Sequence, residues 1–119
     1  YTHVTMAMKN LMGVVWDRMF YHGFGLDRCI AEFCLYRQPD LNILDAYRVL
    51  KSHGPYGNSL EDVVIAKNLL ISQDIVALDT AAGMIFGLPA HKVDYLTIGN
   101  DLKLGKMNLD ELNIKKLIL

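Results

Sequence analysis

The sequence predicts an α/β domain in which helices flank a small, layered and mostly parallel sheet. Three apolar runs, at residues 41–46, 64–72 and 112–118, have the length and aliphatic composition of strands. One helical pattern, at residues 26–38, precedes the first run, and another, at residues 74–86, follows the second run. Because strands separated by helices are typical of parallel sheets, we expect a layered packing of this kind. Three strands make a small sheet, so we expect the chain to be part of a larger α/β domain.

The N-terminal quarter combines a short helix with a bulky connection. We expect Val4 to Leu11 to form the helix, with Thr5 as its cap and Gly13 as its stop. Residues 14–25 are rich in aromatic side chains and glycine, and they predict an ordered loop.

The middle of the chain contains a helix, a strand and a connection in that order. Apolar residues recur at helical spacing within residues 26–38, and Pro39 ends the pattern. Residues 41–46 predict a buried strand that ends near Asp45. The polar residues 47–59, with two glycine turns, predict a loop.

The C-terminal half begins with the second strand and continues with two helices. Asp74 is expected to cap a helix that runs to Phe86, and the Gly-Leu-Pro turn at residues 87–89 to end it. A further helix is expected at about residues 90–102. Residues 112–118, which carry two lysines, predict an edge strand.

Composition excludes several classes of function. The chain has 119 residues, of which 52% are hydrophobic and 21% charged, and this is typical of one globular domain. Its net charge of −1 argues against a nucleic-acid partner, which favours a basic surface. No apolar run reaches the roughly 18 residues of a membrane span. The chain starts without a methionine or a leader, so we expect the C-terminal part of a longer protein that is cytoplasmic or exported.

The metal-binding residue types are scattered. Cys29 and Cys34 lie five residues apart, which is not the spacing of a zinc, redox or cluster pair, so we expect buried thiols. The four histidines also lack the spacing of metal ligands. The sequence therefore predicts no metal or other cofactor within this chain.

Four motifs follow one another in a familiar order. They are "THVTMAMKNLMG" at residues 2–13, "PDLNILDA" at 39–46, "GPYGN" at 54–58 and "SQDIVALDTAAGMIFGLP" at 72–89. In this order the chain resembles the C-terminal half of the domain of unknown function 362 family. The resemblance implies no established reaction. Because some members carry ferredoxin-like iron–sulfur modules, it implies a redox association, with any cluster in the parent protein outside this segment. Because some members are exported with a twin-arginine leader, it leaves the compartment open.

The first helix carries candidate ligand-binding residues. Thr5, Lys9 and Met12 share one face at 100° per residue, Asn10 lies on another, and His3 is next to the helix start. Free N–H groups at a helix start favour an anion such as a carboxylate or a phosphate. The alternative is a capped amphipathic helix whose Lys9 lies in solvent. The family resemblance, in which the Lys-Asn pair recurs, favours the site.

Three aspartates are candidates for binding or catalysis. If the sheet is parallel, Asp45 and Asp74 follow strands at one edge, where they could bind a metal or act as acid and base. Asp74 has the simpler alternative role of a helix cap. Asp79 falls within an apolar stripe, and a buried carboxylate needs a partner. Lys9, Lys67 or a loop N–H group is expected to supply it.

The connection at residues 52–58 has the composition of a ligand loop, because glycine permits close approach of the backbone. The alternative is a turn-rich connector with an exposed histidine. Ser59 and Asp62 have capping-box spacing, but a β-rich run follows them and we expect no helix there. The candidate binding residues of this loop are His53, Gly54, Gly57 and Asn58.

The hypothesis is a ligand-binding or enzymatic domain with an anion-binding pocket near the first helix and the glycine loop. Its expected partner is a small anionic ligand, without nucleic acid or membrane. The alternative is a non-catalytic module. In that case the aromatic segment 16–24 docks on the rest of the parent chain or on another protomer.

Overall fold

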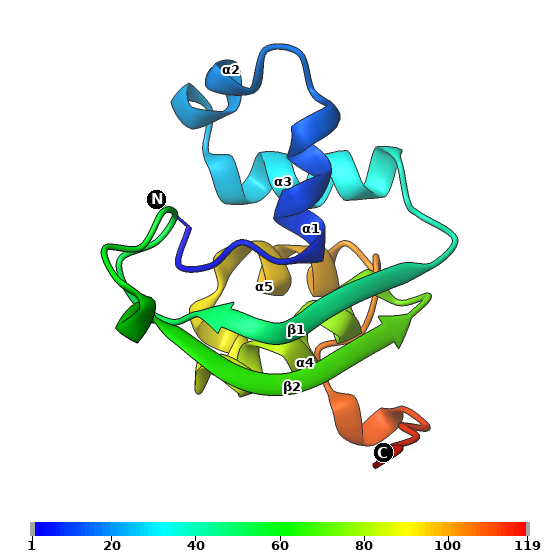
Figure 1. Ribbon diagram of the computed structural model, residues 1–119. Coiled ribbons are helices and arrows are strands. Elements are labelled where there is room, and N and C mark those ends of the chain that lie inside the picture. The colour runs from blue at the N-terminus through cyan, green and yellow to red at the C-terminus, as the bar shows by residue number, and fades with distance from the viewer. Residues whose placement is uncertain (1, 119) are drawn as a thin grey trace.

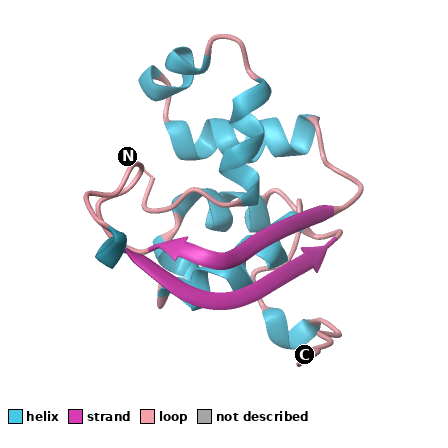
Figure 2. Cartoon of the chain, viewed as in Figure 1, coloured by secondary structure: helices cyan, strands magenta, loops and turns pink. Residues whose placement is uncertain are grey.

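A computed structural model describes residues 2–118 and confirms the α/β class. The fold combines five α-helices with a two-stranded sheet: α4 and α5 lie behind the strands, and α1, α2 and α3 lie above them in the view of Figures 1 and 2. The α-helices are α1 (Ala7–Asn10), α2 (Arg18–Gly23), α3 (Leu26–Tyr36), α4 (Ile75–Phe86) and α5 (Asp94–Asp101). The strands are β1 (Asn42–Leu50) and β2 (Val63–Ser72), and the short 3-10 helices are η1 (Leu11–Val14), η2 (Leu60–Asp62), η3 (Ala90–Lys92) and η4 (Leu109–Glu111).

The sheet is antiparallel, so the prediction of a mostly parallel sheet was wrong. Asn42 pairs with Ser72 at one end of the ladder, and Leu50 pairs with Val63 at the other. The connection between the strands holds only η2, whereas a parallel pair needs a long crossover such as a helix. The register shifts once, beside Lys67, whose φ of 53° is left-handed.

The predicted strand at residues 112–118 was also wrong. These residues follow η4 without regular secondary structure. Ile114, Leu117 and Ile118 are exposed, although their apolar character suggested a strand. A strand needs a hydrogen-bonded neighbour, and the described sheet contains only β1 and β2.

Helix α4 is the centre of the fold and was predicted well. It packs against both strands and against α1 and α5, so all of its first six residues are buried. Asp74 caps it by accepting a hydrogen bond from the backbone N–H of Ala77 at 2.8 Å. Gly87 ends it with a left-handed φ of 70°, as the sequence predicted. Across residues 2–118, no helix combines the length and apolar character that a membrane crossing requires.

Helix α3 packs on α5 and buries one of the two cysteines. Cys34 is fully buried, which confirms the prediction for that thiol, whereas Cys29 is half-buried. The region predicted as a helix at 90–102 consists of η3 followed by α5.

The N-terminal quarter differs from its prediction in two ways. The first helix is limited to Ala7–Asn10, and Met6 rather than Thr5 occupies the N-cap position, without a side-chain hydrogen bond. The predicted loop at residues 14–25 contains α2, which Asp17 caps through the N–H of Phe20 at 3.4 Å. With six residues, fewer than two turns, this helix is too short to produce a clear helical pattern in the sequence.

Candidate functional site

A pocket of about 230 Å³ lies between α1, η1 and α2 and opens to solvent. It brings together three of the predicted binding residues, Thr5, Lys9 and Asn10. Its complete lining is Thr5, Lys9, Asn10, Met12, Gly13, Arg18, His22 and Leu26.

The polar groups of this pocket are cationic or neutral. Lys9 comes from α1, while Arg18 and His22 come from α2. Lys9 is half-buried, and its Nζ donates a hydrogen bond to the Thr2 hydroxyl oxygen. Sequence reasoning did not find Arg18 or His22 as site residues, because it treated their segment as a loop. Asp17 at the cap position of α2 was the available signal.

Asp79 of α4 holds the start of α1 in place. Its Oδ1 accepts the backbone N–H of Ala7 at 2.7 Å, and its Oδ2 accepts that of Met8 at 2.9 Å. The carboxylate thus caps the helix from a position 71 and 72 residues away in the chain. The sequence correctly predicted that buried Asp79 needs a partner, but the suggested partners Lys9 and Lys67 were wrong.

Burial dominates the electrostatics around Asp79. The side chain is 0% exposed, and loss of hydration raises its pKa to about 7 in spite of the two N–H groups, which lower it. Cys34 and Tyr95 lie close enough for the charge of Asp79 to raise their pKa values, after burial as the larger cause. Burial and that charge bring the pKa of Cys34 to about 12, so the thiol is protonated at neutral pH.

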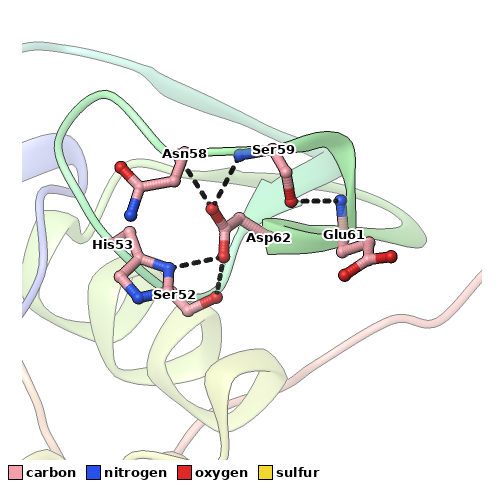
Figure 3. Close-up of polar contacts among 6 residues, drawn as sticks. All are labelled: Ser52, His53, Asn58, Ser59, Glu61 and Asp62. Atoms are coloured by element: carbon pink, nitrogen blue, oxygen red, sulfur yellow. Dashed lines mark hydrogen bonds and ion pairs between the residues drawn. The ribbon is translucent and has the colours of Figure 1, made fainter.

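The glycine loop is organised around Asp62, a residue that the sequence analysis did not propose for the site. Figure 3 shows four groups converging on its carboxylate. Oδ1 accepts the Ser52 hydroxyl at 2.5 Å and lies 2.7 Å from Nδ1 of His53. Oδ2 accepts the backbone N–H groups of Asn58 at 2.7 Å and Ser59 at 3.1 Å. The capping-box spacing of Ser59 and Asp62, which we had discounted, was the signal, because the box is present at η2.

These hydrogen bonds, led by that from Ser52, lower the pKa of Asp62 below the usual range and keep it ionised. An ionised Asp62 orients His53 with Nδ1 inward. His53 itself adopts a left-handed φ of 52° and its side chain is 60% exposed. Gly57 also has a left-handed φ, of 71°, and a Cβ there would lie 3.0 Å from the Leu50 side chain. The loop therefore needs glycine at position 57, while Gly54 is exposed and unconstrained by neighbours.

A comparison with family models identifies the kind of domain. The model described as Domain of unknown function (DUF362) matches residues 1–83, which is more than half of the chain. The chain belongs to the DUF362 family. No curated protein and no solved structure matches it. The match confirms the family that the four motifs indicated.

The matched part of this DUF362 domain contains all the arrangements described above. The pocket, the Asp62 loop and Asp79 lie within residues 1–83, whereas α5 and the C-terminal segment lie outside that range. The segment that matches the family model therefore includes all the residues that line the cationic pocket.

The DUF362 domain does not place all predicted site residues in one cavity. Asp45 lies in the middle of β1, opposite Leu69, and is exposed on the outer face of the sheet. Its predicted position at a strand end was wrong, because residues 47–50, which were predicted as loop, continue β1 to Leu50. Its predicted place beside Asp74 was wrong because the sheet is antiparallel, so the residue that follows β2 lies near the start of β1. His3 is exposed, and neither it nor the glycine loop lines the pocket at α1.

Asp74 has a structural role in the DUF362 domain. Besides capping α4, its Oδ2 accepts the backbone N–H of Lys106 at 2.9 Å and ties down the C-terminal segment. Within the described residues, no group of three or more His, Cys, Asp or Glu side chains is arranged to hold a metal ion. Asp45 lies within β1 and Asp74 at the start of α4, so the prediction that the two acids follow strands at one sheet edge was wrong.

Proposed function

We propose that this DUF362 domain binds a small anionic group, a carboxylate or a phosphate, in the pocket between α1, η1 and α2. The observation that carries the proposal is the convergence of Lys9, Arg18 and His22 on one concavity. Among the described residues that line it, none is acidic. A cationic pocket on a chain with a net charge of −1 is a local feature rather than a consequence of composition.

The neutral lining residues suit the same ligand. The hydroxyl of Thr5 and the side-chain amide of Asn10 can donate hydrogen bonds to anionic oxygens. Arg18 can bind a carboxylate or a phosphate through two parallel N–H groups. Met12 and Leu26 provide apolar contacts for the remainder of the ligand.

The direct test is a titration with inorganic phosphate, followed by NMR of the backbone amides. Shifts are expected at Lys9, Asn10 and Arg18. Lys9→Met and Arg18→Gln should each weaken binding by about tenfold or more, since a hydrogen bond to a charged group contributes about 1.5–3 kcal/mol. The thermal stability of Lys9→Met should stay within about 1 kcal/mol of the parent.

The matched control is Lys116→Met, which removes an exposed lysine in the C-terminal segment outside the pocket. If Lys9→Met and Arg18→Gln bind phosphate as tightly as the parent chain, the pocket is rejected. If Lys116→Met weakens binding as much as the two pocket variants, phosphate is attracted by the overall charge of the chain rather than bound at a site.

A redox association, with an iron–sulfur module elsewhere in the parent protein, is the part of the proposal that rests on the family resemblance alone. The sequence of the parent protein tests it, through the presence or absence of a run of cluster cysteines outside this segment.

A second candidate function is protein interaction through the segment 16–24. The support is the exposure of large apolar side chains, with Trp16 102% and Met19 72% exposed. Phe20 and Phe24 stack on each other with centroids 4.1 Å apart, and both are also exposed. The proposed partner is a second copy of this chain. Sedimentation on dilution tests this candidate, and a Trp16→Ser variant should stay monomeric at concentrations where the parent chain associates.

A further inference from the structure

Helix α1 depends on Asp79 for its position. The helix has four residues, and an isolated helix of that length is unstable in water. Its own N-cap residue, Met6, contributes no side-chain hydrogen bond. Both oxygens of Asp79 instead hold the N–H groups of Ala7 and Met8, at 2.7 and 2.9 Å.

The two residues that follow Met8 in this helix are Lys9 and Asn10, and both line the cationic pocket. The backbone held by Asp79 is therefore continuous with the backbone that carries two of the binding side chains. Asp79 itself is fully buried and is not part of the pocket lining. It can act on a ligand only through α1.

We infer that Asp79 is a positioning residue of the anion pocket, whose carboxylate fixes α1 so that Lys9 and Asn10 point into it. This inference rests on the proposed function of the pocket. It assigns the buried carboxylate a role beyond packing, since an apolar side chain would fill the same space without holding the two N–H groups. Loss of the clamp reduces the fraction of molecules in which the pocket is assembled, and the apparent affinity falls by that fraction.

Among the groups that surround Asp79, the protonation of Asp79 itself is the main property that changes with pH. Cys34 of α3 and Tyr95 of α5 face it, and burial keeps both protonated at neutral pH. The N–H groups of Ala7 and Met8 face it from α1. The residues that β1 and β2 turn toward the core are uncharged, namely Asn42, Leu44, Ala46 and Leu70.

The test compares the sulfate affinity of the domain with that of Asp79→Asn at about pH 8 and about pH 5.5. Sulfate is the probe because its charge does not change in this range. At the higher pH, Asp79 is mostly ionised, and the variant should bind sulfate about tenfold more weakly, since asparagine can accept only one of the two N–H bonds. At the lower pH, Asp79 is mostly protonated, and the difference should shrink toward unity.

Two further variants keep the result interpretable. Ala7→Pro removes one of the clamped N–H groups at the first helical position, where proline is tolerated, and should also weaken sulfate binding. Val93→Ala removes buried carbon atoms at the start of α5 and should lower stability without changing sulfate affinity.

The outcomes separate the two proposals. Equal sulfate affinity of the parent, Asp79→Asn and Ala7→Pro would overturn the role of Asp79 while leaving the pocket intact. A difference that stays constant with pH would also overturn it, because the ionised carboxylate would then not be the clamp. Failure of the parent domain to bind either sulfate or phosphate would reject the pocket itself and, with it, this role.

Discussion

Raising the pH from about 4 to about 8 should destabilise this DUF362 domain through one residue, Asp79. Folding raises the pKa of this carboxyl from 3.8 to about 7, mainly because it is buried. The folded state therefore retains a proton that the unfolded chain releases. The stabilisation is fully present below the unfolded pKa and is lost as the pH rises through the folded value.

The size of the effect follows from the shift. A difference of about 3 pKa units at about 1.4 kcal/mol each gives a loss of roughly 4 kcal/mol between the two ends of this range. Asp79→Asn should abolish this slope. At high pH the variant should be about as stable as the parent or more so, because removal of the buried charge offsets the lost acceptor.

Urea unfolding followed by circular dichroism is the suitable assay, because Trp16 is 102% exposed and its fluorescence would report folding poorly. The exposed Asp101 provides the control, and Asp101→Asn should leave the slope unchanged. The reasoning would be refuted if the parent grew more stable between about pH 4 and pH 7, or if Asp79→Asn kept the slope.

Two other residues give independent predictions. Hydrogen bonds lower the pKa of Asp62. The stability that ionised Asp62 gives to the loop is therefore present above the ordinary pKa of an aspartate and is lost when the pH falls below that value. Asp62→Asn should accordingly speed amide exchange at Asn58 and Ser59 near neutral pH, and unchanged exchange would argue against the network. Gly105→Ala should destabilise the fold by about 1–3 kcal/mol, since the new Cβ would lie 2.0 Å from Oδ1 of Asp74. Thermal unfolding would show this as a lower Tm, and an unchanged Tm would contradict the close approach.

Local sequence signals predicted the elements that are determined locally. The cap at Asp74 and the stop at Gly87 defined α4, because each acts within one turn of the helix. The apolar stripe also marked Asp79 as buried, since a helical period reveals which side faces the core. The identity of its partner could not be read in this way, because Ala7 and Met8 are 72 and 71 residues away.

The direction of the strands was missed for a related reason. An apolar run carries no information on its partner, and the long connection 51–62 resembled a loop before a crossover rather than the turn of a hairpin. A second error, in the length of the first strand, placed Asp45 at a strand end, where a ligand site is expected, because residues 47–50 were predicted as loop but continue β1 to Leu50. The position of a candidate residue was thus only as accurate as the predicted topology.

The stability and the proposed binding activity place opposite demands on Asp79. Below about pH 7 the protonated carboxyl is compatible with its apolar surroundings, and the fold gains stability. Above that value the ionised carboxylate accepts both N–H groups of α1 more strongly, but it must remain unhydrated in the core. An asparagine or an apolar residue would relieve this conflict at the expense of the clamp. A variant that is as stable as the parent but binds sulfate more weakly would therefore distinguish positioning from packing, because a purely structural residue has no reason to separate the two properties.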